Sequence, residues 1–278
     1  MYISYILYLV CIIILLRVII YTPCTIHIIH RIDPSNTGDM VSSCSNYFHF
    51  PNHVKHDIYK VDLTKIKYND FVIFSGGGLV DNNDGWNNTI NSVLDKCRNC
   101  YAWGVGINLH TNSTIKTPIK YDKFKRIGIR DYNHNKIPYL PCSSCMIPEL
   151  RNTYIIKREY GVLEHIHHEI NLDLPKLKNN KDIKEIIRFI GESKYIITNT
   201  YHCLYFSMLM KKKVILFEKF SSKFNSLRHQ PVMYSGNLKE DFKKCKIYPE
   251  FHKESMQLNK DFYNKFSRDY QIRRIVGF

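Results

Sequence analysis

Short apolar runs alternate along the chain with segments long enough to form helices. In the clearest example, an apolar run at residues 195–198 precedes a polar turn at 199–202, a helix-length segment and a second apolar run at 214–217. This order predicts strand, turn, helix and strand, which together form a βαβ unit of a parallel sheet. Both runs are almost continuously hydrophobic, as expected of strands whose two sheet faces are covered by helices.

Similar patterns recur on either side of this unit. Apolar residues at helical spacing predict helices near 90–97 and 183–190, and phenylalanines between 249 and 268 predict a closing helix that docks by its apolar face. Further apolar runs predict strands at residues 25–30, 70–75, 101–106, 126–129 and 160–165. The pattern is typical of an α/β protein with parallel sheets.

The length of 278 residues allows one large domain or two small ones. The expected boundary is the segment 141–152, which holds two prolines. It separates an N-terminal domain, residues 24–150, from a C-terminal domain, residues 151–278. Within the second domain, the lysine-rich segment 175–181 is expected to be a polar loop.

Residues 2–22 form an almost unbroken apolar stretch in which Arg17 is the charged residue. A helix that spans a membrane needs roughly 20 such residues. The stretch has no basic leading region and no small-residue cleavage site, so we expect a retained membrane anchor, residues 1–23, rather than a cleaved signal. The alternative is a buried first strand and helix, but residues 25–30 already supply a first strand. The orientation in the membrane stays open.

The polar turn of the central unit carries the first candidate chemistry. In parallel sheets ligands bind at the carboxyl ends of strands, beside helix N-termini whose free N–H groups favour anions. Thr200 is placed to cap the helix, and His202 falls in its first turn, where its side chain can face a ligand. A histidine in this place is a candidate acid or base.

These residues carry a resemblance to a known family. The sequence resembles the polysaccharide pyruvyl transferases, in the branch that reads Thr-(Asp/Ser)-Ser-(Phe/Tyr)-His where this chain has residues 198–202. The resemblance covers nearly all of residues 25–270 and implies a fold similar to the GT-B glycosyltransferases, with two Rossmann-like domains facing a cleft. Other matching pieces occur in order at residues 36–39, 76–78, 103–106, 129–131, 141–145, 221–224 and 259–263.

The resemblance implies transfer of a pyruvyl group from phosphoenolpyruvate to a sugar, which forms a ketal. His202 would act as the acid that protonates the donor, and basic residues would hold its phosphate and carboxylate. Well-matched family members read Arg-Leu-His where this chain has Thr200-Tyr201-His202, and Lys223 or Arg228 is the candidate replacement for that arginine. The candidate substrate-binding residues are Asp39, Gly76, Gly77, Gly78, Arg130, Thr200, Tyr201, Ser222, Lys223, Arg228 and His229.

The net charge of the chain indicates which classes of partner it can bind. The chain has 40 Lys and Arg against 25 Asp and Glu, a formal net charge of +15. Such a balance favours nucleic acid, an anionic membrane surface or a phosphorylated small molecule. Because no nucleic-acid motif appears and the basic residues are spread over many segments, we expect no nucleic acid partner.

Two groups of residues raise the question of a metal. The pairs Cys97/Cys100 and Cys142/Cys145 invite a four-thiolate zinc site, but the interval between them is longer than in compact zinc ribbons. Glu164, His165, His167 and His168 form a second cluster, which we interpret as surface or supporting histidines. No metal and no cofactor are expected.

Two other functions remain open. The same histidine and basic loop would suit a GT-B-type glycosyltransferase that uses a nucleotide-sugar. A third reading is a non-catalytic protein of glycan assembly that keeps only the fold. The expected partners are therefore a phosphoenolpyruvate or nucleotide-sugar donor, a glycan acceptor, and a membrane through residues 2–22.

Overall fold

A computed structural model of the chain describes residues 24–110, 114–132, 134 and 136–276. The N-terminal domain contains a five-stranded sheet in the order β2-β1-β3-β4-β5, with every neighbouring pair parallel. This arrangement confirms the predicted α/β class. The strands are β1 (Ile26–His30), β2 (His53–Asp57), β3 (Phe71–Ser75), β4 (Asn99–Val105) and β5 (Arg126–Ile129).

The C-terminal domain contains a second five-stranded parallel sheet in the order β10-β9-β8-β6-β7. Its strands are β6 (Arg158–Glu164), β7 (Lys176–Lys178), β8 (Ser193–Thr198), β9 (Lys213–Leu216) and β10 (Val232–Met233). The helices of the two domains are α2 (Thr37–Val41), α3 (Asp84–Lys96), α4 (Ile183–Gly191), α5 (Tyr201–Leu209), α6 (Leu238–Lys244) and α7 (Phe251–Val276).

Strands β2, β7 and β10 were not predicted, and β7 lies within the segment expected to be a polar loop. All three are edge strands, as the order of each sheet shows. Their sequences are polar or short, such as Lys-Leu-Lys in β7, because an edge strand buries only part of its surface. Apolar runs therefore reveal the central strands, and of the edge strands they reveal only β5.

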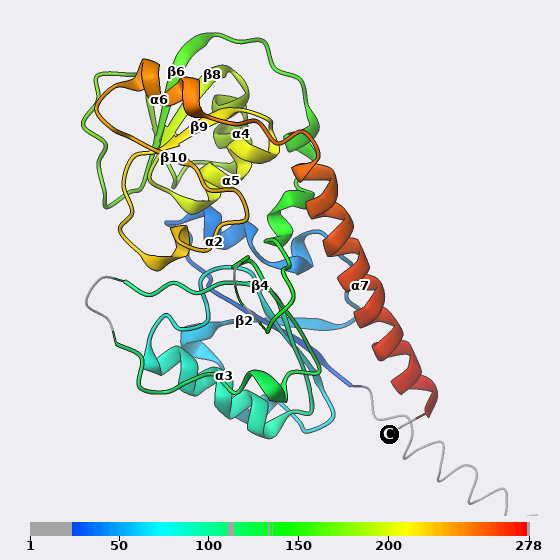
Figure 1. The fold of residues 1–278 in the computed structure, drawn as a ribbon. Helices are drawn as coiled ribbons and strands as arrows, with labels where there is room; N and C mark the ends of the chain where they lie inside the picture. Colours follow the sequence, from blue (N-terminus) through cyan, green and yellow to red (C-terminus); the bar gives the residue numbers. More distant parts are fainter. Residues whose placement is uncertain (1–23, 111–113, 133, 135, 277–278) are drawn as a thin grey trace, which may run out of the picture.

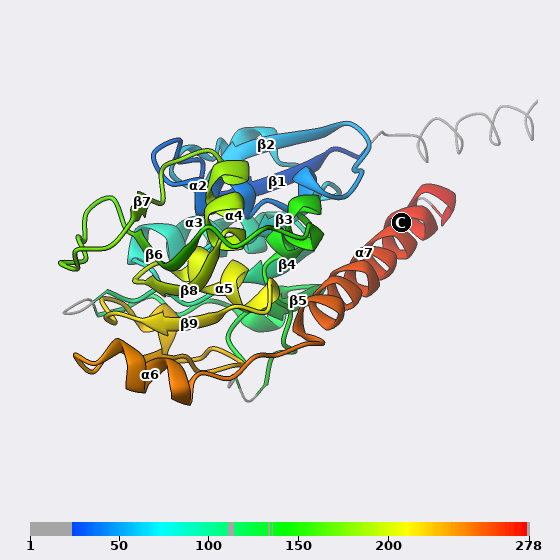
Figure 2. The same cartoon turned by 90° about the horizontal axis from the view of Figure 1, so that it is seen from above.

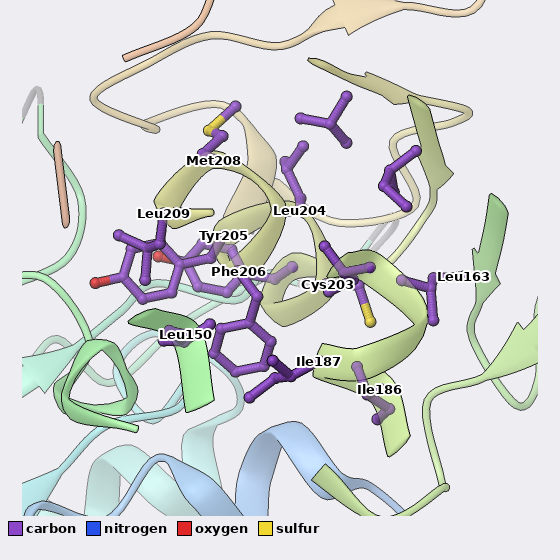
Figure 3. Close-up of a cluster of buried hydrophobic side chains, with 14 of the residues drawn as sticks. Leu150, Leu163, Ile186, Ile187, Cys203, Leu204, Tyr205, Phe206, Met208 and Leu209 are labelled. Carbon is purple, nitrogen blue, oxygen red and sulfur yellow. The ribbon is translucent and has the colours of Figure 1, made fainter. Parts of the chain in front are cut away.

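Helix α5 is the best-packed element of the C-terminal domain. Its residues from Cys203 to Leu209 are all buried, and the core cluster around them draws on α4, β6 and the segment that joins the domains (Figure 3). A helix that is apolar on every side has to be surrounded by protein. This packing fixes α5, so that its N-terminal turn faces α2 of the other domain, with which it is in contact (Figure 1).

Helix α7 runs along one side of both domains (Figures 1 and 2). Phe251 packs into the core of the C-terminal domain, whereas Phe262 and Phe266 pack into that of the N-terminal domain. Between them, Asn259 accepts a hydrogen bond from the Trp103 Nε1 at 2.7 Å and donates one to the Pro141 carbonyl at 3.2 Å. The closing helix thus joins both domains to the segment between them, instead of belonging to one domain alone.

In the part of the chain that the structure describes, none of the helices combines the length and apolar character needed to cross a bilayer. The expected anchor, residues 1–23, lies outside the described residues.

Candidate functional site

A cavity of about 360 Å³ lies between the two domains, where the carboxyl ends of their strands face each other. The segments after β1 to β5 line it from one side, and those after β6 to β9 line it from the other. Seven of the residues predicted from the sequence are brought together there: Asp39, Gly78, Arg130, Thr200, Tyr201, His202 and Lys223.

His202 sits in the first turn of α5, as the sequence predicted. Thr200 caps this helix, since its Oγ1 accepts a hydrogen bond from the Cys203 N–H at 3.3 Å. The imidazole lies between the two domains, with its Nε2 3.7 Å from the Cys142 Sγ and its Nδ1 against Gly38. A Cβ atom on Gly38 would lie 2.2 Å from this Nδ1, so only glycine leaves room for the ring.

The surroundings of His202 favour its neutral form. Burial lowers its pKa well below the usual value of 6.5, and the nearby charges of Arg130 and Lys223 lower it further. His202 is therefore uncharged at neutral pH in these surroundings. An anion bound between these cations would oppose their effect and raise the pKa of His202 again.

Arg130 follows β5 and is held by its surroundings without an acidic partner. Its side chain is buried and passes across Gly106, and its guanidinium carbon lies 3.8 Å from the centre of the Tyr201 ring. Among the described residues it forms no ion pair with a carboxylate. A buried guanidinium is stable with a paired anion or a ring beneath it, and here the ring leaves the N–H groups available.

Lys223 is the second cation of the cavity, and it comes from the loop after β9. Its Nζ lies 4.3 Å from the centre of the Phe220 ring and 5.2 Å from that of Phe224. Burial, together with the charge of Arg130, lowers the pKa of Lys223 to about 7, while Asp39 acts in the opposite direction. In the described part of the chain no carboxylate forms an ion pair with Lys223.

Asp39 lies in the first turn of α2 and faces the same cavity. Burial raises its pKa to about 6, although the charges of Lys223 and Arg130 act to lower it. Its Oδ2 accepts a hydrogen bond from the Asn36 Nδ2 at 3.0 Å. At neutral pH this carboxylate is ionised for most of the time, but it takes up a proton readily.

Histidines from both domains line the cavity beside these cations. Burial lowers the pKa of His165 to about 4, and Lys223 and the neighbouring histidines act in the same direction. Burial, with the charge of Lys223, also lowers the pKa of His110, so both rings are neutral at neutral pH. His168 stacks on Phe220 with 4.2 Å between the ring centres. His165, His167 and His168, which were predicted to be surface or supporting histidines, line the cavity, and His167 is exposed.

Five predicted site residues lie outside the cavity lining. Gly76 and Gly77 adopt left-handed backbone angles, φ 58° and 68°, in the turn after β3, and a Cβ on Gly76 would meet the Ser42 carbonyl oxygen at 2.1 Å. The Ser222 Oγ accepts a hydrogen bond from the Leu109 N–H at 2.7 Å and so joins the two domains. Arg228 pairs with Glu254 at 2.7 Å, and His229 stacks on Tyr248 with 3.8 Å between ring centres.

The two cysteine pairs lie in different cores. Cys97 and Cys100 belong to the core beside α3, whereas Cys142 and Cys145 belong to the core around α5. Across the described residues, no group of three or more histidine, cysteine or acidic side chains is arranged to hold a metal ion. Each pair packs in its core, and the Cys142 Sγ also lies 3.7 Å from the Nε2 of His202.

Sequence reasoning missed a set of cavity residues in the N-terminal domain. Each follows β2, β3 or β4, so the only signal in the sequence was a position shortly after a strand. Tyr59 lacked even this signal, because strand β2 was not predicted. They are Tyr59, Asn82, Trp86, Asn108 and His110.

The structure has two five-stranded parallel sheets, and a cavity lies between the carboxyl ends of their strands. This architecture is consistent with the GT-B-like class of two-domain α/β proteins. Within this architecture, residues 120–218 match the family model of the polysaccharide pyruvyl transferases. The matched stretch contains both Arg130 and His202, and it supports the family predicted from the sequence over this part of the chain.

The chain is also similar in structure to an uncharacterised protein from Klebsiella pneumoniae whose crystal structure is known. The TM-score is 0.50 at 15% sequence identity, and the similarity covers 77% of this chain and 90% of the other. At this identity the likeness shows the fold alone. No curated protein matches the chain.

Proposed function

We propose that this protein transfers a pyruvyl group from phosphoenolpyruvate to a sugar and forms a cyclic ketal. The observation that carries the proposal is the pair of cations, buried Arg130 and half-buried Lys223, beside His202 in one cavity. Among the described residues neither cation forms an ion pair with a carboxylate, so the cavity offers charge for an anionic ligand. The match of residues 120–218 to the pyruvyl transferase family supports the same reading.

The proposed reaction needs one acid and two anion-binding groups. Protonation of the donor at C3 creates a cation at C2, which a sugar hydroxyl attacks while it loses its proton. A second hydroxyl then displaces phosphate from C2, and its proton leaves with the phosphate. Two C–O bonds to the sugar thus replace the C2–C3 π bond and the C–O bond to phosphate, and C3 becomes a methyl group. Arg130 suits the planar carboxylate through paired N–H groups, and Lys223 suits the phosphate as a compact charge.

Binding of the donor would also favour protonation of His202, the proposed acid. The pKa of His202 is low because the ring is buried and because Arg130 and Lys223 are close. A ligand with a carboxylate and a phosphate neutralises both cations and favours the imidazolium. His202 would therefore gain its proton together with the donor and give it to C3. Asp39, whose pKa is raised to about 6, would accept the proton from the sugar.

The experiment is turnover of phosphoenolpyruvate with a panel of glycan acceptors, measured as phosphate release and as ketal formation by mass spectrometry. His202→Gln should lose at least about a hundredfold in rate, the usual contribution of a positioned acid. His229→Gln is the matched control, since His229 stacks on Tyr248 outside the cavity lining.

The outcome also separates the other two functions. Turnover with nucleotide-sugars and none with phosphoenolpyruvate would replace the proposal by a glycosyltransferase. Glycan binding that is equal in the wild type and in His202→Gln, with no turnover of either donor, would indicate a non-catalytic protein.

A further inference from the structure

One wall of the cavity is uncharged and aromatic, in contrast to the cationic part around His202. The N-terminal domain builds it from the loops that follow β1 to β4. From this wall we infer a binding subsite for a neutral sugar ring, which deepens the proposed function by giving the acceptor a place and a chemical class. The wall consists of Asn36, Thr37, Tyr59, Asn82, Trp86 and Asn108.

Two atoms of this wall are buried and lack hydrogen-bond partners. They are the Trp86 Nε1, a donor, and the Asn108 Oδ1, an acceptor. Trp86 is 7% exposed. A buried polar group without a partner costs roughly 1–3 kcal/mol, so each unpaired atom in a folded protein calls for an explanation. Because both residues line the cavity, a ligand bound there is the natural source of the missing partners.

The amides of Asn36 and Asn82 and the hydroxyl of Thr37 already have partners. The Asn36 Nδ2 donates to Asp39, the Thr37 Oγ1 donates to the Lys181 carbonyl, and the Asn82 Nδ2 donates to the Gly78 carbonyl. These bonds fix the shape of the wall. Of the buried side-chain atoms in this wall, the Trp86 Nε1 and the Asn108 Oδ1 are left without a partner.

The pairing of one donor with one acceptor selects the chemistry of that ligand. An ionised phosphate or carboxylate accepts hydrogen bonds but donates none, so it would satisfy the indole N–H and leave the Asn108 oxygen unpaired. A sugar hydroxyl both donates and accepts. The ligand that fits both atoms therefore carries hydroxyl groups and no charge at this point.

The aromatic rings suit the same ligand. Tyr59 and Trp86 meet edge to face, with 5.0 Å between ring centres, and Tyr59 is 62% exposed. Flat rings with a polar edge provide apolar surface for the C–H face of a sugar. The guanidinium carbon of Arg31 lies 4.9 Å from the centre of the Tyr59 ring and covers part of it. Arg31 is paired with Asp33 and Asp57 at 3.2 and 2.7 Å, so these carboxylates balance its charge.

The test is calorimetric binding of methyl glycosides of galactose, glucose and mannose to the full chain, with the methyl glycoside of glucuronic acid as the charged comparison. Trp86→Phe keeps a ring but removes the indole N–H, and Asn108→Leu removes the amide. Each should weaken binding of a neutral glycoside about threefold to tenfold, the effect of one hydrogen bond. Tyr59→Ala should weaken it as well, and this exposed residue can be replaced without loss of the fold.

Asn91→Ala is the matched control. Asn91 lies on the same helix as Trp86, but its amide bonds to the Pro118 carbonyl and the Lys120 N–H, away from the cavity lining. It should bind glycosides as the wild type does. Equal glycoside affinity in Trp86→Phe, Asn108→Leu, Tyr59→Ala and the wild type would overturn the inference, as would tighter binding of the glucuronide or of uridine diphosphate to this wall.

Failure of the inference can be told apart from failure of the proposed function. Arg130→Met should abolish binding of phosphoenolpyruvate and leave glycoside affinity unchanged. If glycosides bind through Trp86 and Asn108 while phosphoenolpyruvate neither binds nor turns over, the sugar subsite stands and the donor assignment fails.

Discussion

Two arginines face the cavity, and they are held in opposite ways. Arg31, after β1, contacts Asp57 at 2.7 Å and Asp33 at 3.2 Å, and its charge is balanced by the protein itself. Arg130, after β5, lies over the Tyr201 ring at 3.8 Å and has no acidic partner among the described residues. In the corner of the cavity around Arg31, the protein itself balances the positive charge. In the corner around Arg130, a ligand would have to supply the opposite charge.

This difference distinguishes a structural cation from a binding one. A buried charge without a counter-ion lowers the stability of the fold, and proteins retain such charges mainly where a ligand supplies the opposite charge. Lys223 and His202 belong to the Arg130 corner, because both have pKa values lowered by burial and by the neighbouring positive charge. Replacing residues of the Arg130 corner should therefore affect activity most, whereas replacing Arg31 should affect stability most.

The largest effect is expected for Arg130→Met. Loss of the unpaired guanidinium should reduce the rate with phosphoenolpyruvate about a hundredfold to a thousandfold, as for other preorganised groups that stabilise charge. Stability should stay the same or rise, because a buried charge is removed. Arg31→Met should leave turnover nearly normal but lower the free energy of unfolding by roughly 0.5–1 kcal/mol, because it removes a paired charge. Steady-state kinetics and urea unfolding measure both. Equal effects of the two variants on turnover would remove the distinction.

The next effect concerns the place of His202 between the domains. In Gly38→Ala the new Cβ would lie 2.2 Å from the Nδ1 of His202, so the ring or the helix has to move. A displacement of about 1 Å of a catalytic group can cost roughly a hundredfold in rate. Gly85→Ala is the control, since its Cβ would meet the Asn83 Oδ1 at 3.2 Å and the position is helical. A Gly38→Ala enzyme with normal kcat would show that His202 is not the acid.

The comparison also shows how far the sequence could lead. His202 and its cap Thr200 were predictable, because strand, turn and helix follow one another within ten residues. Lys223 and Arg228 lie on one loop and looked equivalent, yet only Lys223 reaches the cavity, while Arg228 pairs with Glu254. Position in an irregular loop does not determine the direction of a side chain.

The uncharged wall was missed for a different reason. Tyr59, Trp86 and Asn108 follow three different strands, and they meet only because β2, β3 and β4 end at the same edge of one sheet. Strand β2 is a polar edge strand without an apolar run, so its presence was not predicted and Tyr59 could not be placed. Central strands and their order determine the fold, but the edges complete the site.

Lys223 gives a prediction about pH. Its pKa is about 7 in the folded protein and 10.5 in an ordinary lysine, so between these values the unfolded chain binds more protons than the folded one. The free energy of unfolding of the wild type should therefore rise from pH 7 to 10 relative to Lys223→Met. The same variant should bind phosphoenolpyruvate about tenfold more weakly. Lys219→Met, on the exposed part of this loop, is the control for both measurements. A parallel pH dependence in the wild type and Lys223→Met would contradict the burial of this charge.

The smallest expected effect is a difference between two buried thiols of one turn, Cys142 and Cys145. The Cys142 Sγ lies 3.7 Å from the Nε2 of His202 and accepts a hydrogen bond from the Ser144 Oγ at 3.2 Å, which leaves its own hydrogen for the imidazole. This contact should hold the neutral ring with its proton on Nδ1. Cys142→Ala should shift the tautomer, seen in the ¹⁵N chemical shifts of His202, and lower kcat about tenfold, the usual effect of losing a group that orients a histidine.

Cys145→Ala is the matched variant for this last test. Cys145 is equally buried, but its Sγ accepts from the Asn259 Nδ2 at 3.4 Å rather than touching the histidine. Both variants remove the same buried atom and should lose similar stability, since the cavity left behind is alike. Only Cys142→Ala should change the tautomer of His202. If both variants leave the ¹⁵N shifts unchanged and reduce kcat alike, the thiol acts by packing alone, and the Arg130 corner holds its histidine without it.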